Sequence, residues 1–207
     1  MSRTKLAAGL GVVTLALGLT AAVPEPADAS FRQRASAPLA LADGQHVGRV
    51  VFSGHRSTIT QVTVRLQLPL SSDAAGFHGF HVHANDDPAN GSGCLADPDR
   101  PAATWFGSAD GHLAEAGSVH GAHAGDLPPL LVTDDGRAHH AAITDRMEVR
   151  DLIGRAVVLH VDADNLGNVP TGTGPTQYTP NSDAATELTD RTGNAGDRLA
   201  CGLITRR

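Results

Sequence analysis

Stretches in which apolar and polar residues alternate are the feature that most limits how this chain can fold. The clearest covers residues 59–68, Ile-Thr-Gln-Val-Thr-Val-Arg-Leu-Gln-Leu, and ends at Pro69. A period of two residues is typical of a β-strand with one buried face. A long stretch with the 3.6-residue period of an amphipathic helix is missing, and residues 147–153 are expected to form one helical turn at most. The sequence therefore predicts an all-β protein.

Shorter runs of the same kind predict further strands along the chain. They span residues 47–52, 76–84 with an interruption at Gly79, 130–132, 138–144, 156–161 and 198–204. Asp134-Asp135-Gly136 lies between two of them and is a typical hairpin turn. Many short strands joined by turns indicate a sandwich or a barrel.

Two connections are unusually long for a compact domain. Residues 85–129 are rich in Gly, Ala, Asp and Pro, and residues 164–197 are rich in Thr, Gly, Asn and Pro. Loops of this length are usually functional or disordered. The first contains four of the seven candidate metal ligands described below, which favours a function for it.

The N-terminal residues have the pattern of a secretory signal peptide. A positively charged head precedes an apolar run over residues 6–22, and the small residues of Ala27-Asp28-Ala29 follow. The apolar run is too short, and too soon followed by proline, for a membrane span. We therefore expect a secreted or cell-envelope protein, with a signal peptide over residues 1–29, a flexible N-terminal arm over residues 30–41 and a folded domain over residues 42–207.

Composition narrows the class of partner. The formal net charge of −6 argues against nucleic-acid binding, which would need a basic stripe. Lys5 is the only lysine and lies in the predicted signal peptide, so the fixed cations of the mature domain are arginines or charged histidines. Aromatic residues make up only 3% of the chain, so the core must consist mainly of aliphatic side chains.

Two cysteines, Cys94 and Cys201, lie in the mature part of the chain. Two cysteines in an exported protein most often form one disulfide. The alternative is a thiolate metal site, which the surplus of histidines makes the weaker interpretation.

Seven residues offer more metal ligands than one ion can use. They are His81, His83, His112, His120, His123, Asp126 and His160. A tetrahedral or square-planar ion takes four ligands. Three of the histidines lie in predicted strands, and the other four residues lie in the first long loop. One rigid set and one loop set suggest two metals of different character.

Each set also has a simpler interpretation. His81 and His83 point to the same side of a strand and could chelate an ion, but such a pair is as often a half-exposed strand face. His160, after three aliphatic residues, is by itself more typical of a core histidine. His120, His123 and Asp126, with a fourth ligand such as His112, suit tetrahedral zinc, and the alternative is a solvated polar loop.

Several motifs follow one another in order from about Gly48 to the C-terminus. They are Gly76-Phe77-His78-Gly79-Phe80-His81-Val82-His83, Cys94, Gly111-His112, His123-Ala124-Gly125-Asp126-Leu127, Val158-Leu159-His160 with Asp164, and Gly193-Asn194-Ala195-Gly196-Asp197-Arg198-Leu199-Ala200-Cys201-Gly202. In this order the chain resembles the copper–zinc superoxide dismutases, in particular secreted bacterial members. The first and last runs are the most specific.

The resemblance implies an eight-stranded Greek-key β-barrel, an immunoglobulin-like sandwich with two long functional loops. It implies copper bound by His81, His83, His112 and His160, and zinc bound by His112, His120, His123 and Asp126, with the His112 ring shared. Asp164 would hydrogen-bond the outer nitrogens of His81 and His120. Arg198 would guide the anion beside copper, and Cys94 and Cys201 would form the family's disulfide.

The resemblance also implies the reaction. One copper per subunit would cycle by one electron and disproportionate superoxide to O₂ and H₂O₂, with His112 and Arg198 as the catalytic residues. One zinc per subunit would hold His112 in place. Such an enzyme protects against extracellular superoxide and needs no nucleic acid and no membrane span. Family members associate through different faces or remain monomers, so a homodimer is compatible with the sequence.

The chain departs from the family's pattern in two places. Only three positions separate His120 from His123, where the family has a longer segment, so zinc occupancy is less secure than copper. The second loop lacks the family's guiding lysines, and Arg191 could substitute. Among the other histidines, His78 is expected to be structural. The rest are expected to lie on the surface, and the adjacent pair His139-His140 could bind adventitious metal. These surface histidines are His46, His55, His139 and His140.

Two other functions fit parts of this pattern. A non-enzymatic copper-binding protein on the same barrel would lack the bridging histidine or the guiding arginine, whereas both His112 and Arg198 are present. A zinc hydrolase would need an open zinc with a general base nearby, and the sequence offers no obvious glutamate for that role.

Overall fold

The computed structural model describes residues 33–54, 59–70, 74–169 and 183–207. The chain separates into two units, Met1–Ser30 and Phe31–Arg207, and all described residues belong to the second. The predicted signal peptide and His55 lie outside the described residues. Among the helices that the structure describes, none has the length and apolarity to cross a membrane.

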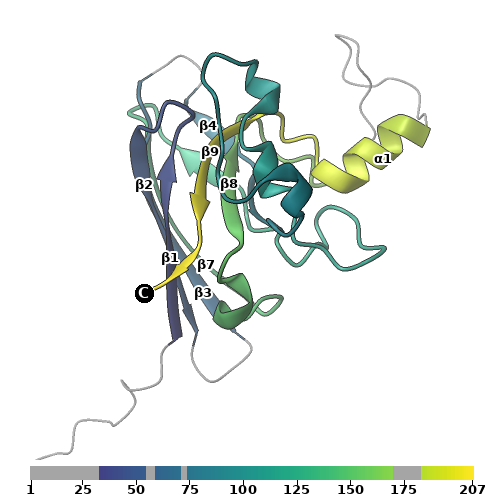
Figure 1. Cartoon of the computed structure of the whole chain (residues 1–207), viewed down its shortest axis with the longest axis horizontal. Helices are drawn as coiled ribbons and strands as arrows, with labels where there is room; N and C mark the ends of the chain where they lie inside the picture. The colour runs from purple at the N-terminus through teal and green to yellow at the C-terminus, as the bar shows by residue number, and fades with distance from the viewer. Residues whose placement is uncertain (1–32, 55–58, 71–73, 170–182) are drawn as a thin grey trace, which may run out of the picture. The chain divides into compact units, whose positions relative to one another are not determined.

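Ten strands make up most of the regular structure of the described residues (Figure 1). They are β1 (Gln33–Ala40), β2 (His46–Gly54), β3 (Thr60–Gln67), β4 (Gly76–His78), β5 (Phe80–His83), β6 (Leu130–Val132), β7 (Arg137–Thr144), β8 (Ala156–His160), β9 (Arg198–Leu203) and β10 (Thr205–Arg206). One antiparallel sheet has the order β5-β8-β9-β1-β2-β3-β7, with β10 also on β1, and β4 pairs with β6.

The small β4–β6 pair links the two edges of the large sheet. β4 continues into β5 across Gly79, and β6 turns into β7 through Asp134-Asp135-Gly136, so the pair spans from β7 to β5. β3 pairs with β7 and not with β4, the next strand in sequence, which is a Greek-key connection. When β4 with β5, and β9 with β10, count as single interrupted strands, the prediction of an eight-stranded Greek-key barrel is confirmed.

The predicted alternation sets the two faces of the strands. In β3, Val62, Val64 and Leu66 are buried while Gln61 and Arg65 are exposed. The main core consists largely of Val, Leu and Ala, with Phe52 and Phe80 as its aromatic members. Full burial of an aliphatic side chain of this size contributes about 1.5–3 kcal/mol, so many small contributions replace the missing aromatic core.

The prediction of a flexible arm over residues 30–41 is wrong for residues 33–40. These residues form β1, which lies in the middle of the sheet between β2 and β9. Ala35, Ala37 and Leu39 are fully buried, and the residues between them face outward. Buried and outward-facing residues do alternate in β1. The segment resembled a linker in the sequence because it contains alanine, serine and Pro38 and has no β-branched residues.

Helices occupy the loops. Short 3₁₀ helices are η2 (Pro88–Asn90), η3 (Ala102–Thr104), η4 (Gly107–Ala109) and η5 (Val149–Leu152). The last confirms the single turn predicted within residues 147–153. The sequence analysis did not predict α1 (Asp183–Thr192), a ten-residue helix in the second long loop. Of its described side chains, Ala185 and Thr189 are buried, so the buried face of the helix is short and only partly apolar. Residues 170–182 of that loop lie outside the described part.

Candidate metal centre

Strand pairing fixes the three histidines that were predicted on strands. β5 and β8 run antiparallel, with His81 opposite Val158 and His83 opposite Ala156. His160 ends β8, and its amide donates to the carbonyl of Gly79 at 2.8 Å. All three side chains are buried, so the barrel wall holds them in place.

Backbone hydrogen bonds bring the first long loop onto β5. The amide of Leu113 donates to the carbonyl of Val82 (2.8 Å), and the amide of Val82 donates to the carbonyl of Gly125 (2.9 Å). A Cβ atom at Gly125 would lie 2.2 Å from the Val82 carbonyl oxygen, so only glycine permits this approach. Two loop ligands, His112 and Asp126, are thereby placed beside the strand histidines.

Four histidines form the first ligand set. The ligand nitrogens of His81, His83, His112 and His160 all lie within 4.8 Å of one another. The Nε2 atoms of His83 and His160 are 3.4 Å apart. Nδ1 of His81 is buried without a hydrogen-bond partner among the described residues. A buried nitrogen lone pair without a donor is costly unless something binds it, so this set fits a nitrogen-preferring metal ion.

His112 also belongs to a second ligand set, with His123 and Asp126. Nδ1 of His112 lies 2.9 Å from Oδ1 of Asp126 and 3.3 Å from Nδ1 of His123. The other carboxylate oxygen of Asp126 accepts hydrogen bonds from the amides of Gly121 and His123. Two imidazoles and a carboxylate that its own loop holds in place suit zinc.

His120 lies at the edge of the second set. Its ligand atom groups with those of His81 and Asp126, and its Nδ1 faces the side-chain oxygen of Asn168 at 3.3 Å. The second long loop covers the ring, because a Cβ at Gly193 would lie 2.3 Å from it. All seven predicted residues therefore come together, but His120 does not join His112 and His123 in one group.

Asp164 contacts the outer ring nitrogens of two of these histidines, His81 and His120. Its Oδ1 atom lies 2.9 Å from Nε2 of His81 and 3.4 Å from Nε2 of His120. Gly79 makes room for it, because a Cβ there would lie 2.7 Å from the same oxygen. A carboxylate that contacts the outer nitrogen of a ligating histidine fixes its tautomer and orientation.

The electrostatics of the site keep the key rings neutral. Burial lowers the pKa of His112 to about 4 and that of His160 to about 3, and it lowers the pKa of His83 well below its ordinary value. Burial would raise the pKa of Asp126, but its hydrogen bond to His112 and the nearby rings outweigh this and lower it to about 2. Neutral imidazoles and an ionised carboxylate are the forms that bind metals.

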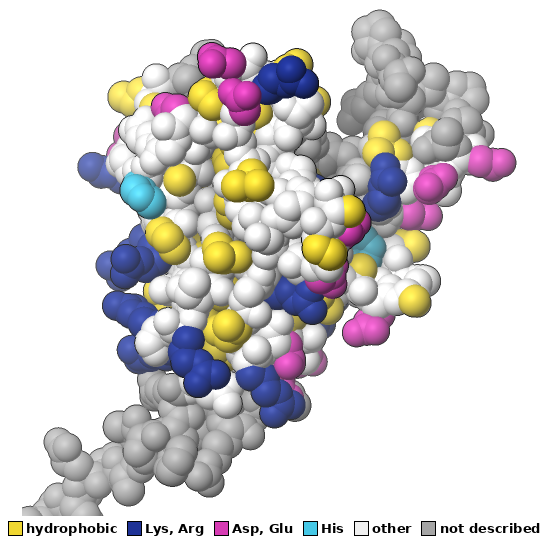
Figure 2. Space-filling view, viewed as in Figure 1, with side chains coloured by type: hydrophobic (Ala, Val, Ile, Leu, Met, Phe, Trp, Pro, Cys, Tyr) yellow, Lys and Arg dark blue, Asp and Glu magenta, His cyan; other side chains and the backbone are white. Residues whose placement is uncertain are grey.

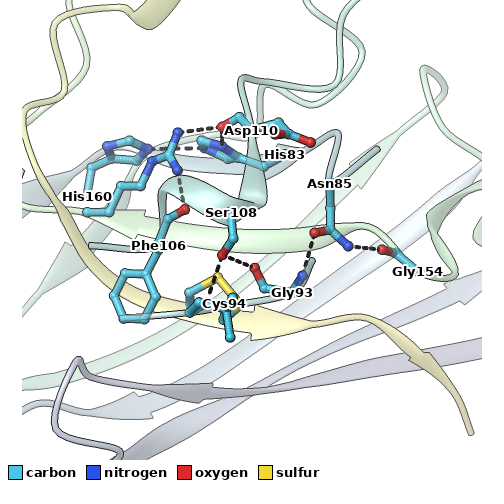
Figure 3. Close-up of a disulfide and its surroundings, with 12 residues drawn as sticks. His83, Asn85, Gly93, Cys94, Phe106, Ser108, Asp110, Gly154 and His160 are labelled. Carbon is cyan, nitrogen blue, oxygen red and sulfur yellow. Dashed lines mark hydrogen bonds between the residues drawn. A yellow bond between two sulfur atoms is a disulfide. The ribbon is translucent and has the colours of Figure 1, made fainter. Parts of the chain in front are cut away.

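An open cleft of about 970 Å³ reaches the first set. His83, His112, His160 and Arg198 line it, whereas His123 and Asp126 do not. The guanidinium of Arg198 donates to the carbonyls of Phe106 and Asp110, both of which have left-handed backbone conformations. Figure 3 shows Phe106 and Asp110 grouped with His83 and His160. The first set is thus open to a small solute, and the second is closed.

The disulfide supports this arginine. Cys94 and Cys201 are bonded, as predicted, and tie the loop to β9 (Figure 3). The amide of Phe106 donates to the carbonyl of Leu95, next to Cys94. Arg198 lies three residues before Cys201 on the same strand. The Cys94–Cys201 disulfide therefore helps to fix both the backbone carbonyls of Phe106 and Asp110 and the Arg198 side chain that donates to them.

Sequence reasoning missed two residues that organise the loops. Arg146 donates from its guanidinium to the carbonyls of Gly121 (3.0 Å) and His123 (3.2 Å), on either side of the shortened loop. Asn168 donates to the carbonyl of His120 at 2.7 Å. A polar residue that binds a distant backbone carbonyl leaves no periodic or spacing signal in the sequence.

The remaining histidines and Arg191 behave as follows. His78 is buried, with ring nitrogens 2.9 Å from the carbonyl oxygen of His160 and 3.1 Å from that of Ala74, so it is structural as predicted. Arg191, on α1, lines the same cleft as Arg198. His46 and His139 are exposed, whereas His140 is half-buried, which corrects its assignment to the surface.

A Greek-key barrel that gathers six histidines and an aspartate into two adjoining ligand sets, one of them open, defines a metal-binding β-barrel. The family model described as "Copper/zinc superoxide dismutase (SODC)" matches residues 46–204. The chain belongs to the copper/zinc superoxide dismutase family.

Solved structures share the fold. The clock protein EA4 has a TM-score of 0.57 and 25% identity, over 83% of this chain and 93% of that one. A double mutant of a SOD-like protein from Bacillus subtilis has a TM-score of 0.55 and 22% identity, over 81% of this chain and 94% of its own. Both are similar to this chain along nearly the whole barrel.

Proposed function

We propose that the protein is a superoxide dismutase that converts two superoxide anions and two protons into O₂ and H₂O₂. One observation carries the proposal: His112 belongs to both ligand sets, and it lies on the same cleft as Arg198. A shared ring between an open site and a closed site, next to a fixed cation, suits one-electron chemistry on a small anion.

The donor atoms suit a different metal in each set. His81, His83, His112 and His160 would hold copper, because four imidazole nitrogens with an open face match its preference. His112, His120, His123 and Asp126 would hold zinc, with His120 turning its Nδ1 from Asn168 toward Asp126. Nδ1 of His112 serves the zinc set, which leaves Nε2 for the copper set.

Copper, when bound, supplies a one-electron couple that accepts an electron from one superoxide and returns it to the next. The protein supplies the rest. His112 holds a proton on the ring nitrogen that faces the cleft and delivers it to the product, and solvent provides the second proton. Burial lowers the pKa of His112 to about 4, so in the metal-free protein the ring is neutral and one of its nitrogens has a lone pair for a metal ion. Asp126 orients the ring through its other nitrogen.

Arg198 attracts and positions the anion in this proposal. The cleft is also lined by carboxylates, among them Asp86, Asp87 and Asp110, in a protein of net charge −6. An anion therefore enters a field that is negative except near the two arginines, Arg191 and Arg198. Local focusing by fixed cations raises association rates by roughly 10 to 1,000-fold. Arg191 would add to the field from α1, in the loop that lacks the family's guiding lysines.

The main alternative is a copper-binding protein without dismutase activity. The similarity to a clock protein and to a SOD-like protein gives this alternative its weight. The presence of His112 and Arg198 together, both on the cleft, favours the enzyme. For location we propose export after removal of residues 1–29, which the Cys94–Cys201 disulfide supports, since disulfides persist outside the cytoplasm.

The test is a metal analysis and a rate measurement on the same sample. Protein loaded with copper and zinc is expected to bind one of each per chain and to remove superoxide catalytically in stopped-flow measurements. Copper-loaded His112→Ala, which retains three of the four copper ligands, is expected to lose most of the rate. A protein that binds copper stoichiometrically but removes superoxide no faster than its metal-free form is a copper-binding protein, and the proposal is then wrong.

A further inference from the structure

Positive charge gathers on one part of the barrel surface, away from the metal centre. In Figure 2, arginine side chains cluster at the lower left, over the region where Figure 1 places β1, β2 and β3, while most Asp and Glu side chains lie elsewhere. Strands β1, β2, β3, β7 and β10 carry five arginines and no acidic residue. The five are Arg34, Arg49, Arg65, Arg137 and Arg206. A protein of net charge −6 thus has a sheet face of the opposite sign.

The end of this face is hollowed into a groove of about 240 Å³. Arg34, Arg150, Arg206 and Arg207 line it, next to apolar Val149. β10 brings the C-terminal arginines to β1, since Arg206 is paired with Ala35 and the amide of Arg207 donates to the carbonyl of Arg34. Four guanidinium groups therefore surround one hollow, which concentrates positive potential there.

Most of these arginines have no counter-ion among the residues that the structure describes. Within the described ranges, no carboxylate forms an ion pair with Arg34, Arg206 or Arg207. Arg150 is different, because it pairs with Glu148 (3.1 Å) and Asp151 (3.6 Å), which offset its charge. Among the described residues these three guanidinium groups have no ion pair, and they are the ones that we expect to bind an external anion.

The positive surface extends from the groove along the sheet. Arg34 pairs with Ser53 of β2, and Arg49 lies four residues further along β2, about 13 Å away at the rise of a strand. Arg49 lies directly opposite Arg65 on β3, and Arg65 lies opposite His139 on β7. Like charges directly opposite on neighbouring strands are unfavourable without a counter-ion. We call Arg34, Arg49, Arg65, Arg206 and Arg207 the arginine strip.

We propose that the arginine strip binds a flexible, linear, phosphate-bearing polyanion. Guanidinium groups bind phosphate through paired N–H donors, which favours phosphate over a diffuse charge. A strip longer than about 13 Å exceeds one small anion, so a chain of linked phosphates fits it better. β8 (Ala156–His160) lies between Ile153, at the groove, and His160, at the metal centre, and this strand alone spans about 13 Å. Bound polymer would therefore leave the cleft open and hold the protein near anionic material.

The test uses long-chain inorganic polyphosphate immobilised on a sensor surface, with the full chain in metal-free and metal-loaded forms. We expect binding that weakens steeply with salt and is the same in both forms, because the strip does not involve the metal centre. Arg34→Gln with Arg206→Gln is expected to weaken binding at least tenfold, as is Arg49→Gln with Arg65→Gln. The matched control is Arg100→Gln with Arg191→Gln, which removes the same charge from the two long loops and is expected to change binding less than about twofold.

Several results would overturn the proposal. Equal weakening in the control pair would mean that only net charge matters. Tighter binding to duplex DNA, or to vesicles containing anionic phospholipid, than to polyphosphate would assign the strip to another partner. Absence of binding by the unaltered chain at 150 mM salt would also reject it. Thermal unfolding of each variant verifies that it is folded.

Discussion

The Oδ1 atom of Asp164 lies 2.9 Å from the Nε2 atom of His81, and both side chains are almost completely buried. The hydrogen bond fixes which nitrogen of His81 faces the cluster, and it leaves Nδ1 buried and free of other partners among the described residues. The same carboxylate oxygen faces His120 at 3.4 Å. One side chain thus links a member of the first ligand set to His120, at the edge of the second.

Replacement of Asp164 is expected to weaken metal binding without removing a ligand. Asp164→Asn takes away the charge that orients His81 and His120, and loss of such an outer carboxylate typically costs 10–100-fold in affinity. Competition with a chelator, measured separately for copper and zinc, checks this. The exposed Asp99→Asn is the control and should leave both affinities unchanged. Equal affinities in Asp164→Asn and the unaltered chain would show that the carboxylate has only a structural role.

Replacement of Arg198 is expected to lower the rate while preserving copper. Arg198→Ala removes the cation beside the first set but none of its ligands, and a loss of about tenfold or more is expected at low ionic strength. The gap between variant and unaltered protein should narrow as salt screens the field. Stopped-flow rates at 10 and 300 mM salt measure it, with Arg137→Ala as control. An unchanged rate at low ionic strength contradicts a guiding role.

Arg146 is expected to matter for zinc and not for copper. Its guanidinium holds the carbonyls of Gly121 and His123, which flank a loop with only two residues between His120 and His123. Without that clamp the loop must be ordered by the ion itself, so Arg146→Gln should lower zinc affinity about tenfold and copper affinity little. Arg150→Gln, an exposed arginine paired with carboxylates, is the matched control. A parallel loss of both metals would instead indicate general unfolding.

The metal-free protein is expected to lose stability as the pH falls from about 6.5 to 4. The pKa values of His112 and His160 are lowered by burial to about 4 and about 3, whereas both rings titrate near 6.5 when unfolded. In this window the unfolded chain binds protons that the folded chain does not, so stability falls with falling pH. The raised pKa of His120, which Asp164 causes against the effect of burial, opposes this in part.

Urea unfolding of metal-free protein at pH 7.5, 6 and 5 measures this dependence. Each unit of pKa displacement corresponds to about 1.4 kcal/mol, so a decrease of a few kcal/mol is expected. His112→Gln should flatten the dependence, and His139→Gln, at an exposed position, should not. A flat profile in the unaltered protein would mean that the rings are not held neutral by burial.

Much of the barrel and all seven candidate ligand residues could be predicted from the sequence, because local patterns contain them. His81 and His83 lie in an alternating run, and Asp134-Asp135-Gly136 marks the turn between β6 and β7. These two strands do not form the predicted hairpin, because β6 pairs with β4 and β7 pairs with β3. β1 was missed because its buried residues Ala35, Ala37 and Leu39 are not β-branched and Pro38 interrupts them. Their strand exists because β2 and β9 cover both of its edges, which no local pattern records.

The position of His120 could not be predicted for a related reason. Its amide donates to the carbonyl of Asp190, in a helix seventy residues further along the chain. Gly193 and Asn168 then decide where its ring points. Spacing along the chain gives the ligand types, but contacts between the two long loops decide the orientation of each ring.

The central claim is that the ring of His112 joins two metal ions, and magnetic coupling tests it most directly. Protein with Cu(II) in the first set and Co(II) in the second is examined by electron paramagnetic resonance, beside protein with Cu(II) alone. Coupling through a shared imidazolate is expected to abolish most of the Cu(II) signal when Co(II) is added, and His112→Ala should restore it. A full Cu(II) signal with both sites occupied in the unaltered protein would contradict the shared ring.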